Sequence, residues 1–126
     1  MYLDALTIAK LSLHDAARVG SSLFVGGRVV SRAPNTGIYH SEVRVIANCP
    51  RAAIRGSTIA IARIWKTGNP ANSLPCHRCL AYLKARKISR IIALYEGQVI
   101  SFSPGDERYK RPIRPWNTPR NKSRDA

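Results

Sequence analysis

Acidic residues are scarce in this chain of 126 residues, where 7 Asp and Glu stand against 21 Lys and Arg and give a formal net charge of +14. The excess is not confined to one end, because residues 1–104 carry 14 basic and 4 acidic side chains and residues 105–126 carry 7 and 3. A field of this sign attracts polyanions such as nucleic acids and nucleotide phosphates. The alternative is a solvated basic surface that serves solubility or meets an acidic partner protein.

Cysteines and long apolar runs are also few. Three cysteines cannot pair completely, and two of them lie three residues apart, so the sequence predicts no disulfide framework and a reducing, cytoplasmic location. No apolar run approaches the roughly 20 residues that a membrane span needs, so we expect no membrane partner. Asp4 and Asp15 fit neither a signal peptide nor an acid-poor transit peptide.

The length suits one domain with a single core. We expect that domain over residues 1–104 and a basic tail rich in Pro and Arg, without sustained periodicity, over residues 105–126. No internal repeat is present. Apolar periodicity and turn residues predict a helix over 2–19 ending at Gly20 and then a hairpin over 23–30 that turns at Gly26-Gly27. A helix over 40–48, stopped by Pro50, and a central strand over 57–66 follow. The last predicted elements are a helix over 75–87, with Pro75 in its first turn, and strands over 88–95 and 99–102.

Two short motifs carry chemistry. H-S-E at 40–42 and P-C-H-R-C at 75–79 each begin a predicted helix, and together they match the H-x-E and P-C-x-x-C signature of zinc deaminases. Either half alone is weak, since C-x-x-C also occurs in redox and structural zinc sites. The combination predicts zinc ligands at His40, Cys76 and Cys79, which leave a fourth position open as a catalytic site requires.

The acidic residue of the first motif has a separate role. Glu42 is two residues from the predicted histidine ligand and is expected to move protons rather than to bind the metal. The alternative is a closed structural zinc site with Cys49 as fourth ligand, which would leave Glu42 without a function. Cys49 is otherwise interpreted as a small buried apolar residue, and His77 as an exposed neighbour of the ligands.

With these motifs in this order, the segment from about 21 to 103 resembles the cytidine deaminase superfamily. The resemblance implies an α/β fold, a three-layer α/β/α sandwich around a five-stranded mixed sheet, and hydrolytic deamination of cytosine, adenine or related bases. It also implies a homo-oligomer. A turn at Gly97 predicts antiparallel pairing of the last two strands, as in the free-nucleoside branch, whereas His40 stands where that branch commonly has cysteine.

The resemblance also suggests where a substrate lies. Asn35 matches an asparagine that contacts the substrate sugar in many members, although it is equally well explained as a turn residue after a proline. Tyr39 can stack on a base, and Ser41 and Pro75 are expected to line the same pocket. The tail combines basic and aromatic residues, which suit phosphate contacts and base stacking. We therefore expect nucleic-acid contact at Arg108, Lys110, Arg111, Arg114 and Trp116. The alternatives are a solubilising extension and an arm that docks on a neighbouring subunit.

The sequence therefore predicts a zinc-dependent hydrolytic deaminase that acts on a cytosine-type base in a nucleoside, a nucleotide or a single-stranded polynucleotide. The alternative is a nucleic-acid-binding or structural assembly protein that keeps the deaminase scaffold and its zinc without turnover. Zinc retention alone would not require Glu42.

Overall fold

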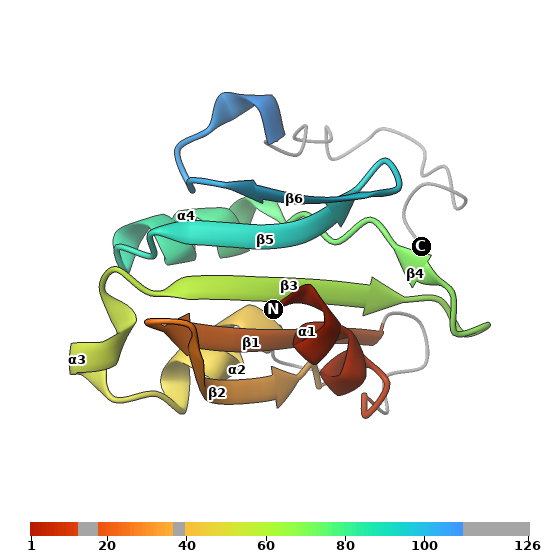
Figure 1. Cartoon of the computed structure of the whole chain (residues 1–126), viewed down its shortest axis with the longest axis horizontal. Helices are drawn as coiled ribbons and strands as arrows, with labels where there is room; N and C mark the ends of the chain where they lie inside the picture. The colour runs from red at the N-terminus through yellow and green to blue at the C-terminus, as the bar shows by residue number, and fades with distance from the viewer. Residues whose placement is uncertain (13–17, 37–39, 110–126) are drawn as a thin grey trace.

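A mixed β-sheet forms the centre of the structure, a computed structural model that describes residues 1–12, 18–36 and 40–109. Its strands lie in the order β2-β1-β3-β5-β6, with a short β4 paired to the end of β3 (Figure 1). β3 and β5 are parallel and every other pair is antiparallel. The strands are β1 (Arg18–Val25), β2 (Arg28–Pro34), β3 (Thr58–Ile64), β4 (Pro70–Ala71), β5 (Arg90–Tyr95) and β6 (Gln98–Phe102).

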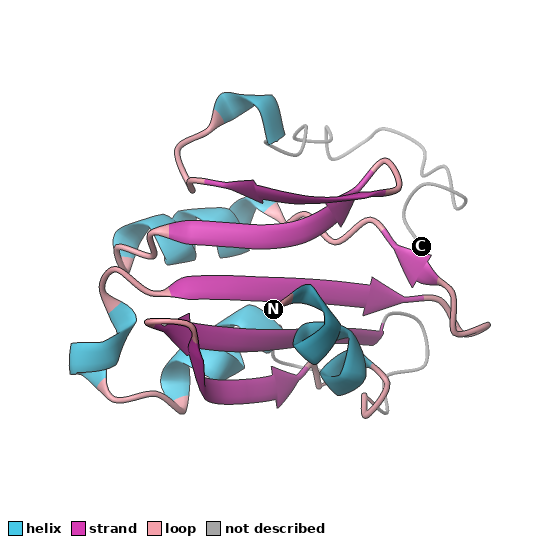
Figure 2. Cartoon of the chain, in the orientation of Figure 1, coloured by secondary structure: helices cyan, strands magenta, loops and turns pink. Residues whose placement is uncertain are grey.

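Helices cover both faces of this sheet (Figure 2). The helix α1 (Tyr2–Ala9) lies on one face, and α2 (Ser41–Ala47), α3 (Arg51–Ile54) and α4 (His77–Ala85) lie on the other. The larger core fills the space between the sheet and the second group of helices, with the fully buried side chains of Leu23, Val45, Ile59, Leu83 and Ile91. This arrangement confirms the predicted α/β fold with a mixed sheet, to which β4 adds two residues.

The single helix α1 packs very closely on β1 and β3. A Cβ at Gly20 would lie 2.2 Å from the backbone nitrogen of Ala9 and 2.5 Å from the carbonyl oxygen of Ala5, so only glycine fits at this point. Ala60 and Ala62 of β3, both fully buried, belong to the same core. Small residues on the sheet therefore set the close approach of the helix.

The N-terminal helix is shorter than the sequence pattern predicts. Residues 18–20, expected as the helix end, instead begin β1 and pair with β3, and Gly20 also pairs with β2. Hydrogen bonding to two neighbouring strands outweighs the helical spacing of the apolar residues in this segment. The hairpin at Gly26-Gly27 and the antiparallel β5–β6 pair are confirmed.

Helix α4 also begins later than predicted. Cys76 is its N-cap, so Pro75 precedes the cap instead of occupying the first turn. Two short elements, α3 and β4, carry too few residues to show a period in the sequence.

The segment after β6 contacts the body of the protein as far as it is described. It forms a 3-10 turn at Glu107–Tyr109 where an extended tail was expected. The ring of Tyr109 lies 5.0 Å from that of Phe102 and 5.8 Å from that of Tyr95, measured between centroids. No helix in residues 1–12, 18–36 and 40–109 has the length and apolar character to cross a membrane.

Candidate metal centre

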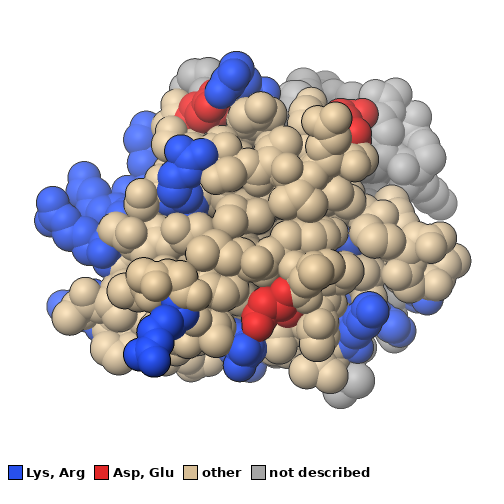
Figure 3. All heavy atoms as spheres, viewed as in Figure 1, with Lys and Arg blue, Asp and Glu red and all other residues tan. Residues whose placement is uncertain are grey.

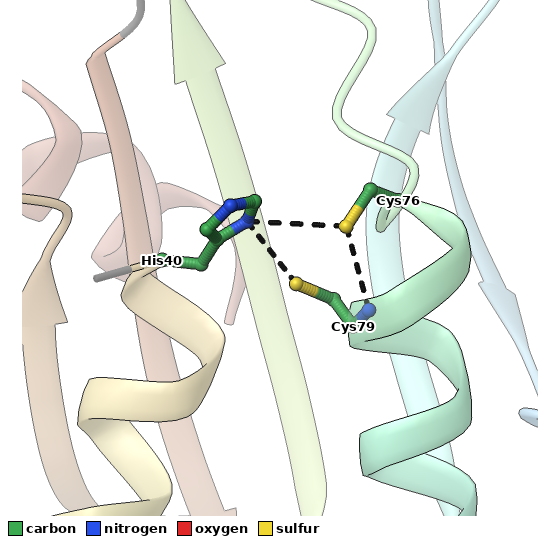
Figure 4. Close-up of side chains that lie close together, drawn as sticks. All are labelled: His40, Cys76 and Cys79. Carbon is green, nitrogen blue, oxygen red and sulfur yellow. Dashed lines mark hydrogen bonds between the residues drawn. The ribbon is translucent and has the colours of Figure 1, made fainter. Parts of the chain in front are cut away.

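Three side chains from two helix starts converge at one end of the sheet. Nδ1 of His40 lies 3.2 Å from Sγ of Cys79 and 3.9 Å from Sγ of Cys76. One ligand atom from each residue lies within 4.8 Å of the other two, and the three side chains point toward one another (Figure 4). The motifs, 36 residues apart in the chain, thus form one group that can hold a metal ion.

The fold places each of these residues at the beginning of a helix. His40 precedes the first turn of α2 in an extended conformation, with φ −68° and ψ 147°. Cys76 occupies the equivalent position on α4, where its Sγ accepts a hydrogen bond of 3.4 Å from the backbone N–H of Cys79. β2 and β3 finish at the same end of the sheet, because Pro34 pairs with Gly20 and Ile64 with Arg18. Helix α2 follows β2 along the chain, and α4 follows β3 and β4.

The donor set and its spacing fit zinc. One imidazole nitrogen and two thiolates are ligands that zinc prefers, and tetrahedral bonds of the usual length would separate sulfur from nitrogen by about 3.5 Å and sulfur from sulfur by about 3.8 Å. The observed separations of 3.2 and 3.9 Å bracket the first value. His40 is exposed and Cys79 is only 3% exposed, so the group is closed toward the core and open toward solvent.

The two thiols of the group differ in acidity. Hydrogen bonds from the side chain and the backbone N–H of Cys79 lower the pKa of Cys76 to about 5, against the effect of burial. The pKa of Cys79 is raised, first by its hydrogen bond to Cys76, then by burial and by the charge of Glu42. In the metal-free protein Cys76 is therefore the more acidic of the two thiols.

Glu42 lies beside this group and is almost fully buried, with 4% of its surface exposed. It is close enough to Cys79 that its carboxylate helps to raise the pKa of that thiol. Oε1 of Glu42 accepts a hydrogen bond of 2.9 Å from Oγ of Ser41. Oγ of Ser41 in turn lies 2.7 Å from Oγ of Ser21 on β1. The fold thus places the carboxylate of Glu42 beside the candidate metal ligands, and the hydroxyls of Ser41 and Ser21 hold it there.

Ser21 is the residue of this arrangement that sequence reasoning missed. It lies 20 positions before Ser41, in a strand with no motif, and only the packing of α2 on β1 brings the two hydroxyls together. The sequence of β1, with an arginine and two adjacent serines, offered no signal that singled it out. Ser41, expected to line a substrate pocket, has a fully buried side chain whose observed partners are Ser21 and Glu42.

Of the other three expected substrate contacts, two lie in the described part of the chain. Oδ1 of Asn35 accepts hydrogen bonds from Oγ of Ser12 at 2.6 Å and from the backbone N–H of Val19 at 3.0 Å, so this oxygen ties the segment after α1 to β1. These contacts join distant segments and are not those of a local turn. Pro75 is buried immediately before the N-cap of α4. Tyr39 lies outside the described residues.

The alternative of a closed structural site receives no support from the geometry. Cys49 is buried in the apolar core with Val45 and Ile54, and it is not part of the group formed by the described histidine, cysteine and acidic residues. His77 is exposed on the first turn of α4 and also stays outside that group. Among the described residues three ligands therefore converge, the number that a catalytic site requires.

Among the predicted nucleic-acid contacts, only Arg108 is described. Its guanidinium pairs with Asp106 at 2.8 Å and lies 5.2 Å from the centre of the Tyr109 ring, so it is engaged within its own turn. The remaining predicted contacts, Lys110, Arg111, Arg114 and Trp116, lie outside the described residues.

Comparison with known proteins identifies the fold. No protein-family model matches the chain, and no curated protein matches its sequence. Two solved structures of Acinetobacter baumannii RibD, forms 1 and 2, are similar, with TM-scores of 0.53 and 0.52 over 71% of this chain and sequence identities of 14% and 15%. The fold is cytidine-deaminase-like. The chain spans only 25% of the RibD chain, and at such identities the likeness concerns the fold alone.

Proposed function

We propose that the chain is a zinc-dependent hydrolytic deaminase that acts on a cytosine-type base. The observation that carries the proposal is the buried carboxylate of Glu42 beside the converging His40, Cys76 and Cys79. A binding protein that used zinc only for its fold would have no use for an acidic side chain at this position. The deaminase-like fold shared with RibD supports the same reaction class.

His40 and the two thiolates would hold the ion. A bound zinc ion supplies a Lewis acid that makes water nucleophilic near neutral pH. Glu42 takes a proton from the attacking water and delivers protons to the ring nitrogen and the departing amine. The C4–N bond of the base breaks, a C4–O bond forms, and ammonia and a uracil-type base are released.

The residues around Glu42 fit this proton-carrying role. Ser41 donates to Oε1 and leaves Oε2 without this constraint, so one carboxylate oxygen anchors the group while the other can exchange protons. Burial removes most of the surrounding water and strengthens the electrostatic effect of the carboxylate. The base itself would be carried by a nucleoside, a nucleotide or a single-stranded polynucleotide, and we propose a homo-oligomer as the active form.

The proposal is tested by ammonia release from cytidine, deoxycytidine, their monophosphates and single-stranded DNA and RNA, with zinc quantified in the same preparation. Glu42→Gln should abolish turnover, because the amide cannot accept the proton, while zinc content and the melting temperature stay near those of the parent. Glu96→Gln is the matched control, since Glu96 lies exposed in the β5–β6 turn.

Stoichiometric zinc without turnover on any of these substrates would instead favour a binding or assembly protein built on the deaminase scaffold. Loss of folding in Glu42→Gln would show that the carboxylate is structural. Equal turnover in Glu42→Gln and the parent would remove the proposed proton carrier.

A further inference from the structure

Half of the basic residues of the body lie at the end of the sheet opposite the candidate metal centre. Of the 14 Lys and Arg in residues 1–104, seven lie at this end, at the start of β2, in or just after α3, in the last residues of α4 and the turn after it, and at the start of β5. All seven side chains are exposed. We call six of them the basic end: Arg28, Arg51, Arg55, Lys84, Arg86 and Lys87.

Backbone contacts fix these turns side by side. The N–H of Gly56, after α3, donates to the carbonyl of Lys87 at 2.9 Å, and the N–H of Ser89 donates to the carbonyl of Ser57 at 2.8 Å. The turn between β1 and β2 meets the same end, because Phe24 pairs with Thr58 at the start of β3 and Val25 pairs with Arg28. Figure 3 shows Lys and Arg side chains gathered at the left edge, where α4 ends.

No acidic group balances these charges within the described part of the chain. The two ion pairs there are Arg32 with Asp4 and Arg108 with Asp106, and neither involves the basic end. Arg90, the seventh cation, lies between the basic end and Asp106, and its charge helps to lower the pKa of that carboxyl. The guanidinium of Arg90 also donates hydrogen bonds to Ser101. The positive field of the basic end is therefore available to an external partner.

The chemistry of the basic end favours phosphate groups that follow one another along a chain. Four of its six cations are arginines, whose planar guanidinium groups can bind phosphate oxygens in pairs. The guanidinium of Arg86 lies 4.6 Å above the centre of the partly exposed Tyr82 ring, which adds a flat surface of the kind on which bases stack. Among the described residues, Val25, 39% exposed, is the only large apolar side chain exposed near this end, so little is offered to a lipid surface.

We propose that the basic end binds the phosphate backbone of a nucleic acid, independently of sequence. The site is separate from the candidate metal centre, because the seven residues of β3 lie between them and a strand of that length spans about 20 Å. The inference does not rest on the proposed deaminase activity. It assigns nucleic-acid contact to the folded body, in contrast to the tail contacts predicted from sequence.

The test compares two variants of the full chain with the same net charge. Arg51→Gln, Arg55→Gln, Lys84→Gln and Arg86→Gln together remove four charges at the basic end. Lys110→Gln, Arg111→Gln, Arg114→Gln and Arg120→Gln together remove four charges from residues 105–126. Each variant falls from +14 to +10, so net charge alone predicts equal effects. Circular dichroism and thermal melting establish that both variants fold.

Binding to a labelled random-sequence duplex and to its single strand is measured by fluorescence anisotropy across about 50 to 200 mM salt. The basic-end variant should bind roughly tenfold or more weakly. Its slope of log K against log salt should fall by about 0.9 for each duplex phosphate that the variant no longer neutralises. The tail variant should keep most of the affinity and slope of the parent.

Several results would overturn the inference. They are equal losses of affinity in the two variants, a loss confined to the tail variant, and no binding of the parent chain at about 100 mM salt. Binding to vesicles containing phosphatidylserine is measured in parallel. A parent chain that prefers these vesicles to nucleic acid, with the same loss in the basic-end variant, would assign the surface to membranes.

Discussion

Oγ of Ser41 donates a hydrogen bond of 2.9 Å to Oε1 of Glu42, and both side chains are buried. A serine hydroxyl carries one proton, so the 2.7 Å contact between Ser41 and Ser21 must then be donated by Ser21. The three groups form a directed chain from β1 through α2 to the carboxylate. Such a chain holds the carboxylate in one orientation while leaving its charge in place.

Ser41→Ala should lower kcat about tenfold, which corresponds to ~1.4 kcal/mol, with KM and zinc content close to those of the parent. The carboxylate loses its anchor and samples orientations that do not reach the reacting atoms. Ser31→Ala is the matched control, because Ser31 donates to the carbonyl of Val45 on the same helix without touching Glu42. Similar kinetics in the two variants would show that the effect is one of helix packing.

Zinc content should depend on Cys79 and not on Cys49. Cys79→Ala removes one of three converging ligands and should leave less than one zinc per chain, whereas Cys49→Ala truncates a cysteine in the apolar core and should retain the ion. Removal of the metal by a chelator should lower the melting temperature of the parent protein, because the ion binds the folded state. Elemental analysis and thermal melting provide both readouts, and equal zinc in the two variants would refute the assigned ligand set.

Alkylation of the metal-free protein should single out Cys76. Its pKa of about 5 makes it a thiolate across neutral pH, so its rate with iodoacetamide should be nearly constant between about pH 6 and 8. Burial raises the pKa of Cys49, whose rate should therefore climb with pH over the same interval. Mass spectrometry of peptides assigns each rate. A rate at Cys76 that rises about tenfold per pH unit would contradict the lowered pKa.

Gly20→Ala should destabilise the protein by about 3 kcal/mol, because the added carbon would lie 2.2 Å from the backbone nitrogen of Ala9 and α1 must move away. Gly105→Ala, where the added carbon meets no atom within 4 Å, should be close to neutral. Urea unfolding compares the two. Equal midpoints would mean that α1 does not hold its position against β1.

Asp4→Asn should cost about 1 kcal/mol of stability at neutral pH. Asp4 accepts hydrogen bonds from Arg32 and from Oγ of Ser22, and those from Arg32 are the main cause of its lowered pKa. A lowered folded-state pKa stabilises the protein above the unfolded value near 4 and ceases to do so as the pH falls through the folded value. The difference between parent and variant should therefore vanish in acid, as denaturant titrations at several pH values would reveal.

Local sequence signals predicted much of this structure. Gly26-Gly27 between two β-prone runs specifies a hairpin, and the two motifs at 40–42 and 75–79 correctly indicated residues that converge. The end of the first helix was wrong, because residues 18–20 owe their strand conformation to partners in β2 and β3 rather than to their neighbours in the chain.

Contacts between distant segments explain what the sequence could not show. Ser21 gains its importance only from the packing of α2, and the basic end arises from turns that are separated along the chain. A count of charges by segment detects the excess of cations but not their meeting point. Close approach at Gly20 was likewise invisible, since glycine there resembled a helix stop.

The hydrogen bonds of Gly56 and Ser89 tie down the loop at the C-terminal end of α4, while Cys76 caps its N-terminal end and Cys79 lies in its first turn. The helix therefore acts as a spacer of fixed length between an anchored loop and the metal ligands. Inserting one residue in its middle would displace the cysteines by about 1.5 Å and turn them by about 100°. Such a chain could keep its sheet and its apolar core and still lose the metal, so the helix tolerates changes of residue far better than changes of length.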